Sequence, residues 1–188
     1  MENKVLVETS ARHVHVSEAT LKVLFGENAE LTVKKMLSQP GQYASEQRVD
    51  LVGPKKTIAN VSILGPCRKS DQVEVSATDA RTLGVNPPVR RSGDLEGSLK
   101  ITLATNKAVI ETDGLIIANR HVHMHTNEAA KYGVCDQQIV KIKIPGAKSG
   151  IIDAEVKVSD TGYYELHIDT DDANAFLIED NDKVTMIV

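Results

Sequence analysis

The sequence predicts a mainly β protein made of two related halves, in which short helices cap the strands. Three observations indicate this class. Segments rich in Val, Ile and Leu recur between turn signals, no long amphipathic helix separates them, and one histidine motif occurs twice. So many short strands are typical of barrels or sandwiches.

The expected strands are short apolar or alternating runs bounded by turn residues. In chain order they cover residues 3–9, 49–53, 57–64, 72–76, 99–104, 108–112, 115–118, 139–144, 151–158, 163–168 and 184–188. Helices are expected where Ser, Thr, Asn or Asp can cap a short periodic segment, at 17–25, 78–83, 127–132 and 171–176. These helices are too short to form a layer, so we expect them to cap the strands.

Composition limits the classes of partner. The 188 residues, 41% of them apolar, can bury the core of one compact domain or of two small ones. A net charge of -4 and the absence of Trp argue against a nucleic-acid surface. No apolar run approaches the roughly 20 residues of a membrane span, and the first residues lack the apolar core of a secretory signal. We therefore expect a soluble, cytoplasmic protein that binds small molecules rather than nucleic acid or membrane.

An internal repeat is visible when the histidines are aligned. The motif Arg-His-Val-His at 12–15 recurs at 120–123, an offset of 121 − 13 = 108 residues, and a short helical segment follows each copy. A weaker sequence similarity links 79–85 to 128–134, where each segment is expected to be a helix that ends at a glycine. We infer two related halves that meet at a shared site.

The repeated histidines have the spacing of metal ligands. His13 and His15 lie two apart, so in a strand both point to one face while Val14 points to the other. His121 and His123 repeat this arrangement. Neutral imidazole suits Zn²⁺, and a catalytic zinc typically keeps three protein ligands and one open position. Two pairs supply four ligands, so each ion needs one more.

Two residues are candidates for the missing ligands. His167 lies between apolar neighbours in Glu165-Leu-His-Ile168, and Glu74 is flanked by Val73 and Val75, so each would face away from the core. Spacing alone does not single out Glu74, because exposed glutamates are common in strands.

Arginines lie near both histidine pairs. Arg68 follows the Gly65-Pro66 turn and precedes the Glu74 strand, where its guanidinium could bind a phosphate with two hydrogen bonds. Arg12 and Arg120 precede the histidine pairs, but their strand phase places them on the faces of Val14 and Val122. We therefore assign neither of them to catalysis.

On these residues the chain resembles the phosphate propanoyltransferases, the phosphotransacylases of propanediol-utilisation type found with bacterial microcompartments. The similarity extends over nearly the whole chain through an ordered series of motifs. They occupy residues 10–17, 37–42, 51–55, 64–69, 92–97, 120–124 and 166–171.

The resemblance implies a fold and a reaction. The fold is two related β-barrels with the active site at their interface, one formed by 1–11 with 119–188 and the other by 12–118, with a lid-like insertion near 36–48. The reaction is the reversible conversion of acyl-CoA and phosphate to acyl phosphate and coenzyme A, with propanoyl or acetyl as the acyl group. A homodimer is expected, and microcompartment proteins are possible partners.

The resemblance also assigns residues. The first zinc ion matches His13, His15 and Glu74, and the second matches His121, His123 and His167. Arg68 matches the phosphate-binding arginine. The positions that contact coenzyme A match Thr9, Ser10, Ala11, Lys55 and Asn174.

Four positions depart from the family pattern or compete with it. His125 stands where the family usually has a small helix-capping residue, and strand phase would allow it as a further ligand. Ser62 replaces a basic coenzyme A contact of some relatives. Only nine residues precede Ser10, so the targeting helix of encapsulated relatives is not expected. Cys67 adjoins Arg68 without an adjacent base, so we expect a structural thiol rather than a covalent nucleophile.

Other classes of protein also use such histidine pairs. Metal-dependent hydrolases, including thioesterases, and cupin-like metalloenzymes are the enzymatic alternatives, although their wider sequence patterns fit less well. A non-enzymatic zinc-binding or storage protein is the third, and Arg68 distinguishes it, because a closed structural site needs no anion-binding arginine.

Overall fold

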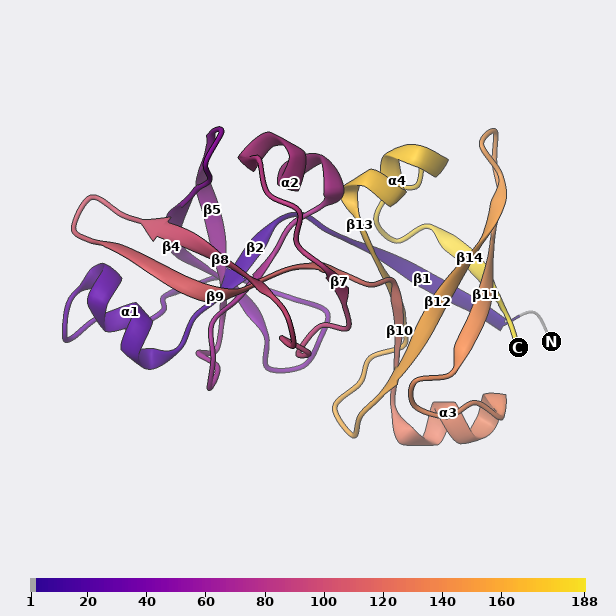
Figure 1. Ribbon diagram of the computed structural model, residues 1–188. Helices are drawn as coiled ribbons and strands as arrows, with labels where there is room; N and C mark the ends of the chain where they lie inside the picture. The colour runs from indigo at the N-terminus through magenta and orange to yellow at the C-terminus, as the bar shows by residue number, and fades with distance from the viewer. Residues whose placement is uncertain (1–2) are drawn as a thin grey trace. The chain divides into compact units, whose positions relative to one another are not determined.

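A computed structural model describes residues 3–188 and is mainly β, as predicted. This part of the chain divides into two compact units (Figure 1). One consists of residues 3–11 with Asn119–Val188, and we call it the terminal barrel. The other is Arg12–Ala118, which we call the central barrel.

The central barrel is a closed ring of strands. Within residues 3–188, six strands pair in the order β4-β5-β2-β6-β9-β8, and β8 pairs back to β4. Their bounds are β2 (His13–His15), β4 (Tyr43–Val52), β5 (Thr57–Gly65), β6 (Gln72–Glu74), β8 (Leu99–Ala104) and β9 (Val109–Ala118). Two short strands extend the sheet, β3 (Val33–Met36) beside β4 and β7 (Val89–Arg90) beside β9. The helices of this unit are α1 (Glu18–Phe25) and α2 (Ala77–Leu83).

The terminal barrel closes with strands from opposite ends of the chain. In the described residues its ring runs β1-β13-β10-β12-β11-β14 and returns to β1. The strands are β1 (Asn3–Ser10), β10 (His121–Met124), β11 (Ile139–Ile144), β12 (Gly150–Val158), β13 (Glu165–Asp169) and β14 (Lys183–Ile187). The helices are α3 (Thr126–Tyr132) and α4 (Thr170–Phe176). Figure 1 shows the indigo β1 inserted between β13 and the yellow β14.

Both barrels have the same pairing pattern, which confirms the prediction of two related halves. β2 pairs parallel with β5 and antiparallel with β6, and β10 does the same with β12 and β13. Continuing round both rings matches β9 to β1, β8 to β14, and β4 to β11. The strand that leads into each histidine pair therefore closes the barrel of the opposite half, since β1 precedes β2 and β9 precedes β10.

Alternating burial explains why the histidine strands lie where they do. Val14 and Val122 are fully buried, one in the core of each barrel. Because side chains alternate across a strand, the histidines on either side of each valine point out of the barrel. The apolar residue between each pair thus fixes the orientation of both ligands.

Strand β9 differs from the two strands expected at 108–112 and 115–118. It is continuous over Val109–Ala118 and passes through Gly114, which has φ +104°. The β8 register shifts beside it, which is a β-bulge. A Cβ at this position would lie 2.4 Å from the carbonyl oxygen of Asp71. Glycine here permits a bulge and a close backbone contact instead of ending the strand.

Capping chemistry places the helices close to the expected bounds. Ser17, Ser76 and Asp169 accept hydrogen bonds from the first turns of α1, α2 and α4. The glycines that follow α2 and α3, Gly84 and Gly133, have left-handed backbone conformations, and both helices end there, as the weaker similarity between 79–85 and 128–134 predicted. Strand order nevertheless matches α1 to α3 and α2 to α4. The weaker similarity therefore reflects the chemistry of helix ends rather than equivalent positions in the two barrels.

The segment expected as a lid-like insertion belongs to a hairpin. Residues 36–48 leave β3, turn, and enter β4, and Met36 is 57% exposed.

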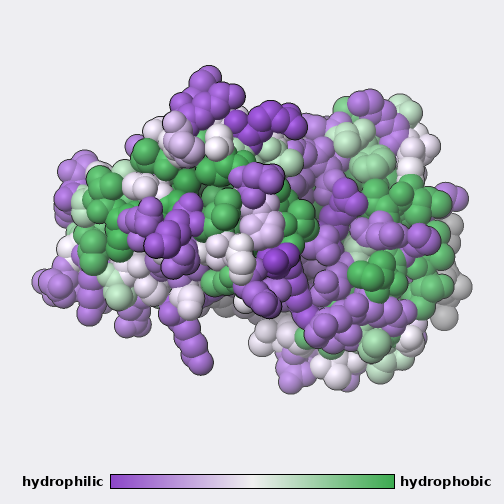
Figure 2. All heavy atoms as spheres, in the orientation of Figure 1, coloured by the Kyte–Doolittle hydropathy of each residue, from purple (hydrophilic) through white to green (hydrophobic). Residues whose placement is uncertain are grey.

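Figure 2 shows hydrophobic and hydrophilic side chains interspersed over the drawn face of each unit. None of the helices in residues 3–188 has the length and apolar character needed to cross a membrane.

Candidate metal centres

The first candidate centre lies on the outer face of the central barrel. His13 and His15 come from β2, and Glu74 comes from the adjacent antiparallel strand β6, directly opposite His13. All three side chains are buried, and their ligand atoms lie within 4.8 Å of one another. His13 Nε2 is 3.5 Å from Glu74 Oε2. The pairing of β6 with β2 thus places Glu74 beside the histidine pair, a position that its spacing in the sequence did not predict.

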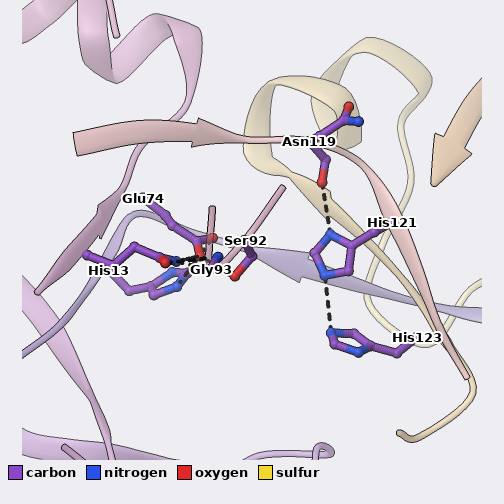
Figure 3. Close-up of polar contacts among 8 residues, drawn as sticks. His13, Glu74, Ser92, Gly93, Asn119, His121 and His123 are labelled. Atoms are coloured by element: carbon purple, nitrogen blue, oxygen red, sulfur yellow. Dashed lines mark hydrogen bonds and ion pairs between the residues drawn. The ribbon is translucent and has the colours of Figure 1, made fainter. Parts of the chain in front are cut away.

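Neighbouring side chains orient the Glu74 carboxylate. Its Oε1 accepts hydrogen bonds from Gln72 Nε2 and from Ser92 Oγ, the latter at 2.9 Å (Figure 3). The amide of Gln72 is held in turn, because Gly93 N donates to its Oε1 at 3.0 Å. With Oε1 occupied, Oε2 is the oxygen that faces His13. Such support of a ligating carboxylate is typical of metal sites.

Burial keeps His15 neutral. Desolvation, followed by the charges of His13 and Arg68, lowers the pKa of His15 to about 2. Its Nδ1 is buried and forms no hydrogen bond. A neutral imidazole with an unsatisfied buried nitrogen is suited to bind a cation.

Arg68 lies beside this first centre. A bridge between Arg68 and Ser17, with Arg68 N donating to Val16 O at 2.9 Å, ties its backbone to the segment that follows β2. Burial lowers the pKa of the Arg68 guanidinium, while nearby Glu74 raises it, and an arginine so placed remains cationic at neutral pH. The charge of Arg68 therefore lies close enough to the candidate centre to act on His15 and Glu74.

Asp71 holds the loop that carries Arg68. Its carboxylate accepts from Ser17 N and Thr20 Oγ1, both at 2.6 Å, and from Thr112 Oγ1 at 2.7 Å. These bonds join the loop before β6 to the start of α1 and to β9. Sequence reasoning did not identify Asp71, because its partners are distant in the chain.

The second candidate centre lies on the outer face of the terminal barrel. His121 and His123 come from β10, and His167 on β13 stands directly opposite His121. The ligand atoms of this group also lie within 4.8 Å of one another. His167 Nε2 is buried without a hydrogen bond and lies 3.5 Å from Glu165 Oε2, a distance too long for a good hydrogen bond.

The backbone selects a tautomer for His121. Its Nδ1 is 2.8 Å from the carbonyl oxygen of Asn119, so Nδ1 carries the proton and Nε2 keeps a lone pair (Figure 3). His121 Nε2 is 3.1 Å from His123 Nε2. Two nitrogens that bind one tetrahedral zinc at about 2.05 Å would lie roughly 3.3 Å apart. The observed separation fits a shared cation.

The two groups occupy equivalent positions in the two barrels. His13 matches His121, His15 matches His123, and Glu74 matches His167, because the third residue lies opposite the first in both registers. The position opposite the second histidine is Gln72 in one barrel and Glu165 in the other. The two candidate groups therefore differ in their third member, which is a carboxylate in the central barrel and an imidazole in the terminal barrel.

The residues assigned to coenzyme A by resemblance are divided between the barrels. Thr9 and Ser10 end β1 beside Ile168 and Asp169, next to the start of α4, and Ala11 follows. Asn174 is exposed on α4 in the same barrel. Lys55 is exposed in the β4–β5 turn of the central barrel, and its N donates to Leu83 O. Their role as contacts remains a prediction.

His125 caps a helix. Its Nδ1 accepts from Asn127 N at 3.1 Å, and Glu128 completes a capping box at the start of α3. Within the described residues, neither ligand group includes His125. His125 thus takes the N-cap position of α3, for which the resemblance predicted a smaller residue.

Cys67 has a weakly reactive environment. Burial, followed by the charges of Glu18 and Asp71, raises the pKa of its thiol. Little thiolate would be present at neutral pH, which opposes a nucleophilic role.

Comparisons with known proteins found a matching family and several similar proteins. The family described as phosphate propanoyltransferase matches residues 6–179. A phosphate propanoyltransferase of Thermotoga maritima is 47% identical over 99% of this chain and 90% of its own. That of Clostridioides difficile is 49% identical over 90% of this chain and 82% of its own, and that of Listeria monocytogenes is 46% identical over 93% and 83%.

The two barrels, each with a group of candidate metal-ligand side chains, are accompanied by similarities over most of the chain to acyltransferases, and the chain is an acyltransferase. The chain belongs to the phosphate propanoyltransferase family.

Proposed function

We propose that the protein is a phosphotransacylase that moves a short acyl group, propanoyl or acetyl, reversibly between coenzyme A and inorganic phosphate. Family membership supports the reaction class, as do relatives named for propanoyl transfer to phosphate. The observation that carries the proposal is the group His13, His15 and Glu74 with the half-buried cation of Arg68 beside it. A metal-ligand set next to an anion-binding guanidinium suits a reaction between a carbonyl and phosphate.

We further propose that each ligand group binds one Zn²⁺. The residues fit zinc because both groups are rich in imidazole, are largely buried, and contain a buried ring nitrogen without a hydrogen bond, His15 Nδ1 in one and His167 Nε2 in the other. Glu74 supplies a negative ligand to one ion. Such sites would keep a coordination position for substrate, since each has three protein ligands.

The proposal includes a single dinuclear centre formed from both groups. Chain connectivity supports it. The chain passes from one unit to the other at Ala11–Arg12 and again at Ala118–Asn119. His13 follows Ala11, the last residue before its crossing, by two residues, and His121 follows Ala118 by three, which are chain lengths of about 7 and 10 Å. Anomalous scattering from a zinc-loaded crystal would measure the distance between the ions.

In the proposed mechanism Arg68 binds and orients phosphate through paired hydrogen bonds. A phosphate oxygen attacks the thioester carbonyl, so that a C–O bond forms, the C–S bond breaks, and the proton of HPO₄²⁻ passes to the coenzyme A sulfur. Zinc, when bound, supplies a Lewis acid for the acyl oxygen and a soft partner for the thiolate. With its pKa near 2, His15 is too weak a base to move protons and serves as a ligand.

Coenzyme A would be held by the residues near the crossing at Ala11. Thr9, Ser10 and Ala11 together with Asn174 would contact it from the terminal barrel, and Lys55 would contribute a cation for its phosphates from the central barrel. The family resemblance also predicts a homodimer, which sedimentation would check, and microcompartment partners, which co-purification from the native cell would check.

The test is an assay that follows two products together. Zinc-quantified protein is incubated with propanoyl-CoA and phosphate, and free thiol and acyl phosphate are measured in parallel. We expect equal amounts of both. Thiol without acyl phosphate would identify a thioesterase, and no product with about two zinc ions bound would favour a structural or storage site.

The variant that tests Arg68 needs a matched control. Arg68→Ala should retain zinc and lose about a hundredfold or more in kcat/KM for phosphate, because a fixed charge on the reacting anion is removed. Arg81→Ala removes an exposed arginine of α2 in the same barrel and should be neutral. Equal activity of Arg68→Ala and wild type would contradict the assignment.

A further inference from the structure

An arginine precedes the histidine pair in each half, and the structure pairs each one with an aspartate. Arg12 Nη1 lies 3.0 Å from Asp79 Oδ1 in the central barrel. In the terminal barrel, Arg120 binds Asp172 with two parallel bonds, Nε to Oδ2 and Nη2 to Oδ1, both at 2.7 Å. We name these pairs the central clamp and the terminal clamp.

The clamps occupy equivalent places. Each arginine immediately precedes the first histidine of its pair. Each aspartate follows the third ligand by five residues, since 79 − 74 = 5 and 172 − 167 = 5. In both barrels the aspartate lies in the first turn of the helix that directly follows the third ligand's strand. Each clamp therefore joins the strand of the histidine pair to the segment that carries the third ligand.

Local structure explains why such a link matters. β2 and β6 are three residues each, and their register covers only the three pairs from His13–Glu74 to His15–Gln72. Strands this short contribute few ladder hydrogen bonds. The clamps lie just beyond the first histidine and the third ligand, where the short ladder ends. There they limit the separation of these two ligands.

The aspartates are the better-buried partners. Their side chains are 11% and 15% exposed, against 42% and 39% for Arg12 and Arg120. Asp79 also shares a capping box with Ser76, and Asp172 N donates to the cap residue Asp169 at 2.8 Å. Hydrogen bonds within its own helix thus orient each aspartate independently of the arginine. Such an oriented carboxylate is suited to act as a rigid support.

We propose that Arg12–Asp79 and Arg120–Asp172 are matching positioning pairs, each of which sets the affinity of its own barrel's ligand group for metal by holding the first and third ligands together. The inference rests on the zinc sites proposed above and assigns a role to residues outside them. It also predicts that each clamp acts mainly on the ion of its own barrel, because each pair joins two segments of one barrel.

The experiment measures zinc release from full-length protein by competition with a chromogenic chelator. Asp172→Asn should weaken one zinc ion per chain by about tenfold to a hundredfold, the range for outer residues that orient metal ligands, and leave the other unchanged. Asp79→Asn should weaken the other ion. Asp160→Asn breaks an exposed hydrogen bond to Thr126 in the terminal barrel, and Glu111→Gln breaks an exposed bridge to Lys100 in the central barrel; both should leave both ions within twofold.

A second readout separates positioning from general stabilisation. A bridge that only stabilises the fold lowers the Tm of zinc-free and zinc-loaded protein equally. A positioning pair reduces the rise in Tm that zinc produces. Arg120→Gln removes the terminal clamp without altering α4, and it should match Asp172→Asn, with no additional loss in the double variant. If Asp172→Asn does not fold, Arg120→Lys replaces it as the test. Lysine keeps the charge but cannot form two parallel bonds, so this variant should lose some zinc affinity, though less than Arg120→Gln.

The outcomes are distinguishable. Wild-type protein that binds no zinc would overturn the proposed metal sites themselves. Wild-type protein that binds two ions, with clamp and control variants indistinguishable in zinc affinity, would overturn the clamps alone. Loss of both ions in either single variant would contradict the independence of the two sites.

Discussion

Strand β1 should be indispensable for the terminal barrel and dispensable for the central one. It closes the ring between β13 and β14, although it lies at the opposite end of the chain. Its inward side chains, Val5 and Val7, are 1% and 2% exposed within the terminal core. Deletion of residues 3–10 is the perturbation.

The magnitude follows from what the deletion removes. Burial of Val5 and Val7 contributes about 3–6 kcal/mol together, at about 1.5–3 kcal/mol for each side chain. The registers with β13 and β14 cover five and four residue pairs, and each lost ladder bond costs about 1 kcal/mol net. A unit of this size has a total stability of about 4–12 kcal/mol. The loss is comparable to that total, so the terminal barrel should unfold.

Amide hydrogen exchange would detect this loss strand by strand. We expect β10–β14 to lose protection in the truncated protein while the central barrel, Arg12–Ala118, keeps its own. A peptide of residues 3–10 added in excess should restore protection. As a matched pair, Val5→Thr with Val7→Thr should lower stability by several kcal/mol, whereas the outward changes Lys4→Thr with Leu6→Thr should cost less than 1 kcal/mol. Native protection of β10–β14 without β1 would refute the closed ring.

Three further predictions concern single residues. Gly114→Ala should lower the free energy of unfolding by about 2–4 kcal/mol, because the new Cβ meets a backbone oxygen at positive φ. Gly146→Ala is the control: this residue has φ +109° but open space around it, so the loss should be only about 1–2 kcal/mol. Chemical denaturation measures both values. Exposed Cys135 should be alkylated faster than Cys67 at pH 8, and the Cys67 rate should keep rising at higher pH because burial raises its pKa; equal rates by mass spectrometry would contradict this. Burial also raises the pKa of the Asp169 carboxyl, so the folded state holds this proton more tightly and ionisation costs stability as pH rises above 3.8. Asp169→Asn still caps α4 but carries no charge, so it should be more stable than wild type at pH 7. Thermal melts should show that this advantage is lost near pH 4.

The amino-acid sequence alone determined the local features of this protein. Alternation around Val14 and Val122 fixes which way the histidines point, because the apolar residue must enter the core. Capping residues set the helix starts to within about one residue of the observed ones. The repeated motif, offset by 108 residues, already indicated two related halves, since duplication preserves spacing within each half.

Tertiary structure decided everything that depends on non-local pairing. Only the register of β6 against β2 brings Glu74 opposite His13, and nothing in its local sequence distinguishes it from other strand glutamates. The pairing of Asp71 with Thr112 requires segments 41 residues apart to meet. The exchange of β1 and β9 between the two halves is equally hidden, because strand propensity does not encode which partner a strand will join. Hydrogen-bond register across distant strands, rather than local pattern, therefore completed both ligand groups.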